Sequence, residues 1–441
     1  MIESDKVCEL CCNEVEGENR PVIVDMFCGS GGESLGIAWS AKKAGLEIEM
    51  FAINHWERAI ETHQANFPEA EHICRDVTDI TPSEVVPDRK VALLWASPAC
   101  THFSKARGGK PCDDQSRVTP FVVLDWLDKL TVDRIIIENV PEFQSWGPLN
   151  PETHRPIRED KGETYKAYIS MIQGLGYAVD WKVLNAADYG APTTRRRLFI
   201  QAVRTRSGKS LLWPEATHAQ TSPNQTLTEG LLAWVPAKDI IDWSLPTQII
   251  DERTRPLAAN TMKRILRGIE RHWGEFAQPF LVRYNGGENR VHSVDNPLPV
   301  LDCSNRYGLV QPLIMCIGHT SNKGGRTRTV DEPLPTIVTK EEACLIEPLI
   351  VPQHSCGEVR PTSGGIHPAL ITPENVRIGF RMLKPHELAA AQGFPQDYIF
   401  TGNRGEVVKQ IGNSVCPKMA EALTSGYMRD LAGCLASTTT G

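Results

Sequence analysis

Short hydrophobic runs alternate with amphipathic stretches over the first half of the chain. The runs are rich in β-branched residues, which is typical of buried strands. They are "PVIVDMF", "EIEMFAIN", "VALLWAS", "DRIIIENV", "VDWKVLN" and "RRLFIQAV". The stretches between them have apolar residues at spacings of three and four, and several end at glycine, as helices often do. Helices are therefore expected at "ESLGIAWSAKKAG", "ERAIETHQANF", "TPFVVLDWLDKL" and "YKAYISMIQGLG".

This alternation predicts an α/β fold in which a doubly wound, mostly parallel sheet is covered by helices on both faces. Ligands bind such sheets at the carboxyl ends of the strands. The segments "DMFCGSGG" and "ENV" stand at such ends, and so does Cys100, which follows "VALLW". We therefore expect one crevice to receive all three.

An internal repeat follows in the second half of the chain. Residues 329–350, "TVDEPLPTIVTKEEACLIEPLI", resemble residues 293–314, "SVDNPLPVLDCSNRYGLVQPLI", at a spacing of 36 residues. A weaker third copy runs from "RPLA" at Arg255 to "QPFLV" at Gln278. Two or three copies are too few for a solenoid. The repeat therefore predicts small strand-and-loop units within one irregular domain.

From about Gly379 the helical pattern returns, with "KPHELAAAQGF" and "PKMAEALTSGYMRDLAG". The α/β domain is thus interrupted by the repeat-bearing region and completed by the C-terminal part. The predicted division is an N-terminal extension at 1–20, a catalytic domain at 21–212, an inserted domain at 213–378 and a completing part at 379–441.

Composition is that of a globular protein, with 41% hydrophobic and 23% charged residues among 441. No apolar run approaches the ~20 residues needed to span a membrane, and the N-terminus does not resemble a signal peptide, so a cytoplasmic location is expected. The 13 cysteines favour reduced thiols over a disulfide framework. Cys8, Cys11 and Cys12 have half of a zinc-site spacing, but free thiols are the favoured interpretation and no metal is predicted.

The net charge of −7 gives no global sign of a nucleic-acid partner. Residues 251–290 nevertheless carry eight Lys and Arg against five acids, a local charge of +3. A basic stretch of this kind is more often ordinary solvated surface, and nucleic-acid binding is the alternative.

Each candidate site residue has an ordinary interpretation when it is taken alone. A cysteine at a strand end, such as Cys100, is more often a buried small hydrophobic residue than a nucleophile. Glu138 is either a surface strand end or a partly buried acid. The "FCGSGG" turn serves either packing or a nucleotide-like cofactor, and "TTRRRLFI" is either a basic strand edge or a functional cluster.

The order of these motifs is more specific than any one of them. A Gly-rich turn, "CRDV", Pro-x-Cys, Glu-Asn-Val, "NAADYGAPTTRRR", a variable region, "AAAQGFPQDY" and "IGNSV" follow one another. This order resembles that of the DNA (cytosine-5) methyltransferases of bacterial or phage type, over about residues 21–204 and 379–431. The resemblance implies a class I S-adenosylmethionine-dependent methyltransferase fold, with a target-recognition domain in the repeat region.

The resemblance also implies site residues. Cys100 matches the nucleophile that adds to carbon 6 of cytosine, and Glu138 matches the acid that protonates ring nitrogen 3. Arg195 and Arg197 match the arginines that hold the target base and the active-site loop. The residues implied for S-adenosylmethionine are Phe27, Gly29, Gly31, Gly32, Trp56, Asp76, Val77, Pro98, Asn413 and Ser414, with Trp56 stacked on the adenine.

The sequence departs from the family pattern at three positions. Ala99 stands between Pro98 and Cys100, His55 replaces the ribose-binding acid, and Thr193 stands where Gln is usual.

The implied partner is double-stranded DNA, bound by a monomer in a prokaryotic host, with a cognate restriction enzyme as a further candidate partner. Two rival hypotheses remain, a tRNA cytosine-5 methyltransferase and an inactive DNA-binding relative. The long region before Gly379 favours DNA, and the retained catalytic residues favour an enzyme.

Overall fold

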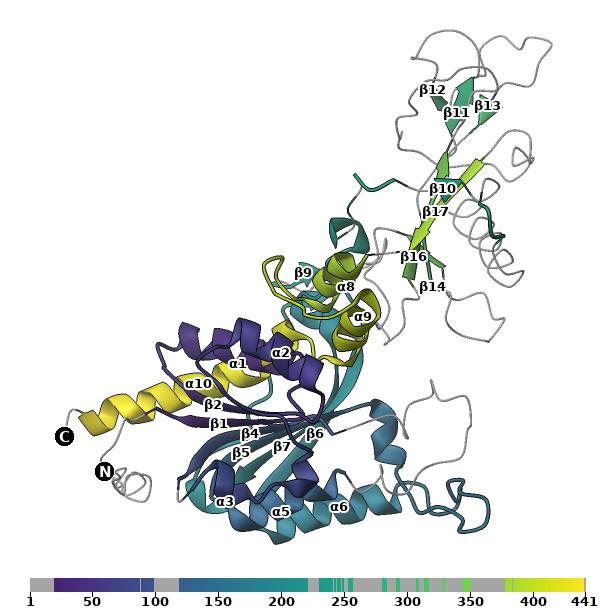
Figure 1. Cartoon of the computed structure of the whole chain (residues 1–441). Helices are drawn as coiled ribbons and strands as arrows, with labels where there is room; N and C mark the ends of the chain where they lie inside the picture. The colour runs from purple at the N-terminus through teal and green to yellow at the C-terminus, as the bar shows by residue number, and fades with distance from the viewer. Residues whose placement is uncertain are drawn as a thin grey trace.

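A computed structural model describes residues 20–87, 89–98, 119–220, 230–240 and 384–439, with shorter stretches between 242 and 382. Its largest sheet has seven strands in the order β3-β2-β1-β4-β5-β7-β6 (Figure 1). The strands are β1 (Val22–Met26), β2 (Glu49–Ile53), β3 (Glu71–Ile73), β4 (Val91–Ala96), β5 (Val132–Asn139), β6 (Tyr177–Asn185) and β7 (Arg196–Arg204). Every residue of β1, β4 and β5 is buried, as expected for strands covered on both faces.

The predicted mostly parallel α/β sheet is confirmed, with one reversed strand. Strands β1 to β5 pair in parallel, whereas β7 is antiparallel to both β5 and β6. Only a short segment containing the 3-10 turn η4 (Ala186–Tyr189) separates β6 from β7. A parallel crossover needs roughly a dozen residues or more, so β7 returns beside β6 in the opposite direction.

Two helices from opposite ends of the chain cover one face of the sheet (Figure 1). Ile37 of α1 (Gly32–Lys43) packs in one buried cluster with Met419 and Leu423 of α10 (Pro417–Thr439) and with Trp95 of β4. The C-terminal helix therefore belongs to the core of the sheet domain.

The other face is covered by α3 (Pro82–Val85), α5 (Phe121–Lys129) and α6 (Glu163–Gly174) (Figure 1). Trp126 of α5 and Tyr168 of α6 are fully buried and pack in one cluster with Leu94 and Ile135 of the sheet. Burying each such side chain contributes about 1.5–3 kcal/mol. Helix α2 (Glu57–Asn66) connects β2 to β3.

Two further helices follow the repeat region. Helix α8 (Pro385–Gln392) lies in the predicted "KPHELAAAQGF" helix, whereas α9 (Arg404–Asn413) was not predicted. A capping box begins α9: the Asn403 side chain accepts from the backbone N–H of Glu406 at 3.1 Å, and the Glu406 carboxylate accepts from the N–H of Asn403 at 2.7 Å.

The short strands of the second half form three further sheets, with orders β10-β17-β16-β14-β15, β12-β11-β13 and β8-β9. In Figure 1 the first two lie away from the seven-stranded sheet, beyond α8 and α9. The strands are β8 (His218–Ala219), β9 (Leu232–Ala233), β10 (Gln248–Ile249), β11 (Phe280–Arg283), β12 (Val291–Ser293), β13 (Tyr307–Gly308), β14 (Leu313–Cys316), β15 (Thr327–Thr329), β16 (Ala343–Leu349) and β17 (Arg377–Met382).

The sequence repeat corresponds to a repeated three-stranded unit. In each unit a central strand lies between two antiparallel neighbours, β11 between β12 and β13, and β14 between β15 and β16. The equivalent Cα pairs are Phe280 with Ser293 and Leu313 with Thr329 on one side, and Arg283 with Tyr307 and Cys316 with Ala343 on the other. Residue 293 of β12 corresponds to residue 329 of β15, and residue 307 of β13 corresponds to residue 343 of β16. Both offsets are 36 residues, which is the spacing of the repeat. The expectation of small strand units is therefore confirmed for the paired segments.

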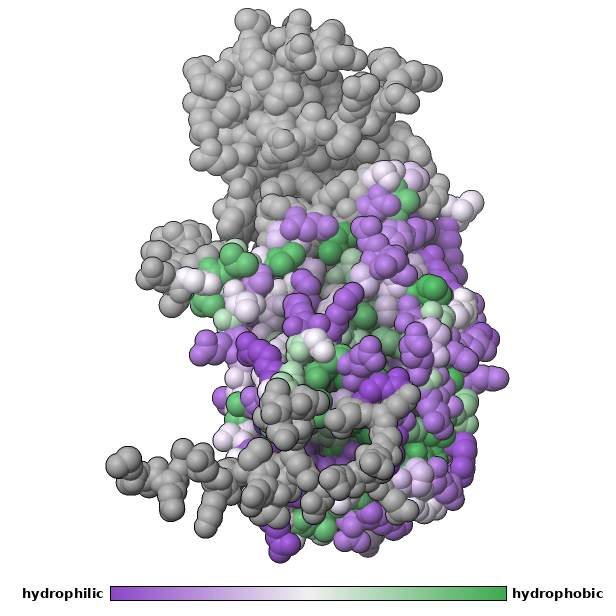
Figure 2. Space-filling model, turned by 90° about the vertical axis from the view of Figure 1, so that its left-hand side faces the viewer, coloured by the Kyte–Doolittle hydropathy of each residue, from purple (hydrophilic) through white to green (hydrophobic). Residues whose placement is uncertain are grey.

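The described surface is mainly hydrophilic on the face in Figure 2, with single hydrophobic residues scattered among polar ones. The large exposed hydrophobic side chains of the described part, such as Met171 and Leu232, come from different elements. Among the helices that the structure describes, none is long and apolar enough to span a bilayer.

Candidate active site

Three of the predicted motifs leave the sheet side by side. Strand β4 lies between β1 and β5, and all three run in parallel, with Met26 opposite Ala96 and Ala96 opposite Ile137. The Gly-rich turn, the segment Ser97–Pro98 and the end of β5 therefore emerge at one edge of the sheet. The sequence places its single expected crevice at this edge, and that crevice stays a prediction.

The Gly-rich turn has an unusual backbone and close neighbours. Phe27 has a positive φ of 66°, a conformation that costs free energy for a residue with a side chain. A Cβ on Gly31, whose φ is 85°, would lie 2.7 Å from the Tyr398 hydroxyl. A Cβ on Gly32 would lie only 2.1 Å from Oγ of Ser414. The turn therefore requires glycine at both positions, because the C-terminal part packs directly on it.

Side-chain hydrogen bonds hold the C-terminal part in this place. The Tyr398 hydroxyl donates to the carbonyl of Ser30 at 2.5 Å, and the Gln392 amide donates to the carbonyl of Ser414 at 2.7 Å. Arg195 is 3% exposed and donates to the carbonyl of Gly412 at 3.1 Å. Arg195 thus links the strand β7 region to the "IGNSV" motif, and its predicted contact with the target base stays a prediction.

The predicted adenine-binding residues lie at the ends of neighbouring elements. Trp56 is the N-cap of α2, and the ammonium of Lys409, on α9, lies 4.2 Å from the centre of its indole ring. Asp76 caps the turn η1 (Val77–Asp79) by accepting from the N–H of Thr78 at 3.0 Å, and this bond lowers the pKa of Asp76. Val77 is buried and Asn413 is exposed.

The approach to Cys100 is described as far as Pro98. Pro98 is buried, and its carbonyl accepts from the side-chain amide of Asn139 at 3.2 Å, so the ends of β4 and β5 are joined. Cys100 and Ala99 lie outside the described residues, as do Cys8, Cys11 and Cys12.

Glu138 and Arg197 form an ion pair beside this segment. Nε of Arg197 lies 2.9 Å from Oε1 of Glu138, and the side chains are 14% and 11% exposed. They come from adjacent antiparallel strands, β7 and β5. A carboxyl and a guanidinium therefore lie together at this edge of the sheet, largely shielded from water.

A buried chain of polar side chains lies behind the Gly-rich turn. Ser34 donates to Asp25 Oδ2, and its oxygen lies 2.9 Å from His63 Nε2. His63 Nδ1 lies 2.8 Å from His72 Nε2. Because Ser34 donates its only proton to Asp25, His63 donates through Nε2 and accepts from His72 through Nδ1. Desolvation lowers the pKa of His63 to about 3, so its ring is neutral.

Two carboxyls of this region have raised pKa values because they are buried. Burial raises the pKa of Asp25 to about 8, against the opposing hydrogen bond from Ser34. Burial, followed by the charge of Asp25, also raises the pKa of Glu33. Oδ1 of Asp25 is buried and accepts no hydrogen bond from the described part of the chain.

These two carboxyls predict a pH-dependent stability. At neutral pH the Asp25 carboxyl, with its pKa of about 8, is mostly protonated in the folded state but ionised in the unfolded chain, and the raised pKa of Glu33 acts in the same direction. Folded protein then binds more protons, so the free energy of unfolding should fall as the pH rises, by up to about 1.4 kcal/mol per pH unit for each carboxyl. Denaturant titrations at several pH values should show this slope, and the double variant Asp25→Asn, Glu33→Gln should lack it. An unchanged slope in the double variant would exclude these carboxyls as its source.

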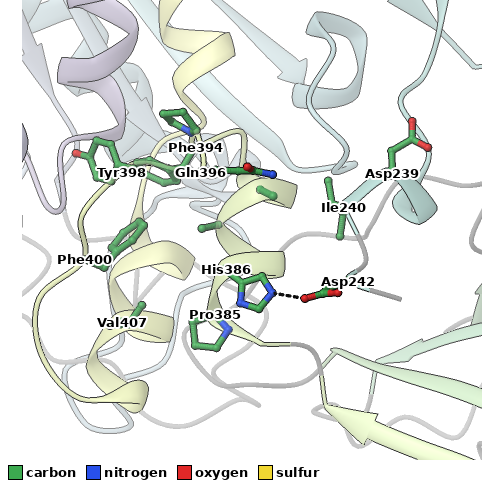
Figure 3. A pocket seen from close by; sticks show the side chains of 13 residues that line it. Asp239, Ile240, Asp242, Pro385, His386, Phe394, Gln396, Tyr398, Phe400 and Val407 are labelled. Carbon is green, nitrogen blue, oxygen red and sulfur yellow. Dashed lines mark ion pairs between the residues drawn. The ribbon is translucent and has the colours of Figure 1, made fainter. Parts of the chain in front are cut away.

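A separate cavity of about 750 Å³ lies between α8, α9 and the turn η6 (Ala237–Ile240) (Figure 3). Phe394, Tyr398 and Phe400 lie on one side of it, and the His386–Asp242 pair, 3.8 Å apart, on the other. None of the residues predicted to bind cofactor or cytosine lines it. We therefore do not assign this cavity to the catalytic step.

The family assignment rests on the whole length of the chain. A family model of C-5 cytosine-specific DNA methylases matches residues 22–428. The chain belongs to this family. The match spans the sheet, the repeat region and about half of α10, so the predicted family is confirmed. Enzymes of this family are DNA cytosine-5 methyltransferases and generally depend on S-adenosylmethionine.

Relatives of different lengths share this similarity. The type II methyltransferase M.MthTI of Methanothermobacter thermautotrophicus is 25% identical over 414 residues, which cover 94% of this chain and 98% of the relative. M1.HphI of Haemophilus parahaemolyticus is 23% identical over 425 residues, covering 92% and 86%. The DNA (cytosine-5)-methyltransferase 1B of Oryza sativa subsp. japonica is 24% identical over 472 residues, but the match covers only 29% of that protein and 96% of this chain.

A solved structure supports the fold. A DNA modification methyltransferase encoded within an Escherichia coli prophage superposes with a TM-score of 0.50 at 20% identity, covering 94% of this chain and 99% of the other. The class I methyltransferase fold predicted from the sequence is therefore confirmed for this cytosine-5 methylase family member.

The sequence did not single out several residues of the site. Asp25 lies in β1, Glu33 in the first turn of α1 and Ser97 directly after β4, and Lys409 contacts Trp56. The sequence carried one signal, for Glu33. The motif "GGESLG" places this carboxylate in the first turn of a helix, directly after the Gly-rich turn.

Proposed function

We propose that this protein transfers a methyl group from S-adenosylmethionine to carbon 5 of cytosine in specific sequences of duplex DNA, through a covalent bond between Cys100 and the base. The observation that supports this most directly is the Glu138–Arg197 pair, 2.9 Å apart, at the same sheet edge as the segment that leads into Cys100. The family's chemistry needs an acid and an arginine near its nucleophile.

Each of these residues has a chemical task in the proposal. Carbon 5 of cytosine is a poor nucleophile, so the Cys100 thiolate adds first to carbon 6. Glu138 donates a proton to ring nitrogen 3, which would otherwise resist the addition. Arg197 holds Glu138 in place and stabilises charge that develops at the carbonyl oxygen of the base. The base must leave the helix to be reached, so the proposal includes base flipping.

The residues around the Gly-rich turn fit a cationic cofactor. S-adenosylmethionine, when bound, supplies the methyl group. Oδ1 of Asp25 is a buried carboxyl oxygen without a partner in the described part of the chain, and a positive charge nearby would stabilise its ionised form. Phe27, Gly29, Gly31 and Gly32 would hold the cofactor from one end of the chain. Trp56, Asp76, Val77 and Pro98 would do so from the neighbouring strand ends, and Asn413 and Ser414 from the other end of the chain.

We propose the same division of the chain as the sequence predicted, with target recognition assigned to residues 213–378. The assignment of target recognition to this region is supported by the repeated three-stranded unit, which lies outside the seven-stranded sheet, and by the basic stretch at 251–290.

Several relatives are named type II methyltransferases, so we also propose a cognate restriction enzyme. We propose a monomer as the active form.

The substrate class can be tested directly. Purified protein should transfer tritium from labelled S-adenosylmethionine to duplex DNA and not to tRNA. Transfer to tRNA alone would favour the RNA-methylating alternative. Binding of DNA without transfer to either substrate would favour an inactive relative.

Exchanging the repeat region should exchange the target sequence. A chimera with residues 213–378 from another family member should methylate that member's site, because base-specific contacts lie in this region while the catalytic residues lie in the sheet domain. Sequencing of methylated cytosines in host DNA measures the preference. An active chimera that keeps the original preference would place recognition elsewhere.

A further inference from the structure

Trp56 lies where β2 ends and α2 begins. It is the N-cap of α2, three residues after Ile53 of β2, and it is half-buried. Its backbone N–H donates to the side-chain oxygen of Asn54 at 2.9 Å, which fixes the main chain at this point. The indole ring extends from this fixed backbone, so a contact on one face of the ring can determine how the ring lies.

The ammonium of Lys409 provides such a contact. It lies 4.2 Å from the centre of the indole ring, within the distance of about 6 Å over which a cation is attracted to an aromatic face. Lys409 is exposed, whereas its neighbours in α9, Val408 and Gln410, are buried. The helix is therefore held by its buried side, while the Lys409 side chain extends over Trp56.

Hydrogen bonds also connect α9 to α2 beside this contact. The side-chain amide of Gln410, the residue after Lys409, donates to the carbonyl of Thr401 at 2.9 Å. The hydroxyl of Thr401 lies 2.9 Å from the hydroxyl of Thr62 on α2. The position of Lys409 relative to Trp56 therefore follows from the packing of the two helices.

Lys409 also lies four residues before Asn413, the last residue of α9. Residues four apart lie on the same side of a helix. One side of α9 thus carries both Lys409, in contact with Trp56, and Asn413, which the proposed function assigns to the cofactor pocket. An indole ring has two faces, so an ammonium on one face leaves the other face for an adenine ring.

We propose that Lys409 is a positioning residue for the cofactor, whose ammonium holds the indole of Trp56 in the orientation on which the adenine of S-adenosylmethionine stacks. The inference rests on the proposed function, because it takes Trp56 as the adenine-binding residue. Lys409 acts through Trp56, so its loss should weaken cofactor binding. A cation–π contact near the surface changes an equilibrium constant by roughly two- to fivefold.

The test measures the binding of S-adenosylhomocysteine by calorimetry in the absence of DNA. Lys409→Met removes the charge but keeps a long side chain, and should weaken binding roughly two- to fivefold. Lys409→Arg keeps a cation over the ring and should bind as the unmodified protein does. Trp56→Leu should weaken binding by roughly tenfold or more, because stacking is lost. Adding Lys409→Met to Trp56→Leu should weaken binding no further, since the residue through which Lys409 acts is gone.

Two control variants separate this role from ordinary stability. Arg58→Met breaks another contact between α2 and α9, in which Nε of Arg58 lies 3.8 Å from Oε2 of Glu406. Lys182→Met removes an ammonium that lies 5.1 Å from the ring centre of Trp213, and Lys182 is on β6 at the other edge of the sheet. Both variants should bind S-adenosylhomocysteine normally, whatever their effect on the unfolding midpoint.

The inference is wrong if Lys409→Met binds S-adenosylhomocysteine as tightly as the unmodified protein, or if Lys409→Arg binds as weakly as Lys409→Met. It is also wrong if Lys409→Met weakens binding equally when Trp56 is already leucine, because Lys409 would then not act through the indole. An equal loss in Arg58→Met would assign the effect to the packing of α9 in general. Normal binding by Trp56→Leu alone would instead refute the adenine site of the proposed function.

Discussion

Replacing Cys100 by serine is expected to abolish methyl transfer and the covalent complex with 5-fluorocytosine DNA. A serine hydroxyl is almost never ionised near neutral pH and adds poorly to carbon 6, so the rate should fall by roughly 10⁴-fold or more. Ordinarily the proton at carbon 5 leaves before the sulfur is eliminated. Fluorine cannot leave as a cation, so the adduct of the unmodified protein should persist through denaturing electrophoresis when S-adenosylmethionine is present.

Cys112 is the internal control for this experiment, because it lies twelve residues after Cys100 in the sequence. Cys112→Ser should leave the trapped complex intact. A complex that persists in the Cys100 variant and disappears in the Cys112 variant would assign the nucleophile to Cys112.

The fold of the sheet domain was predictable because the signals are local. Runs such as "VALLW" and "RIIIEN" are buried on both faces, so their hydrophobicity is continuous, and glycines end the helices between them. Helix α9 was missed because its capping box, formed by Asn403 and Glu406, is followed by only a short apolar pattern. The reversal of β7 depends on how short its connection to β6 is, and hydrophobic patterning alone does not reveal strand direction.

The site was predictable only where it consists of ordered motifs. The Gly-rich turn, the end of β4 and Glu138 could be brought together from the rule that ligands bind at the carboxyl ends of parallel strands. Hydrogen bonds between distant residues have no such pattern. The pairs Tyr398–Ser30 and Arg195–Gly412 join residues that are far apart in sequence, and only packing brings them together.

Packing also limits how the C-terminal contribution can be tested. A truncation before Gly412 would remove α10, whose Met419, Leu423 and Met428 lie in the core of the sheet domain. Loss of cofactor binding would then reflect unfolding. Gly32→Ala is the sharper change, because it places a methyl group against Ser414 while leaving the core intact.

Glu138→Gln should lower the rate of methyl transfer by about 10²- to 10⁴-fold, the usual contribution of a positioned general acid. The amide has nearly the same shape and still offers an oxygen to Arg197, 2.9 Å away, but it cannot give a proton to ring nitrogen 3. Single-turnover transfer to duplex DNA measures the loss, and cofactor affinity should stay unchanged.

The same substitution at the two buried carboxyls of this edge separates their roles. Glu138→Gln removes a proton donor and should be severely slowed, whereas Glu33→Gln changes a buried carboxyl that the proposed chemistry does not use and should react nearly normally. Comparable stability of the two variants would exclude general disruption of the edge. If Glu138→Gln transferred methyl groups within about tenfold of the normal rate, a loss smaller than general acid catalysis provides, the proton would have to come from another group. Glu33 is one candidate, because Glu138 acts to raise its pKa, and the double variant would then show the loss that Glu138→Gln alone did not.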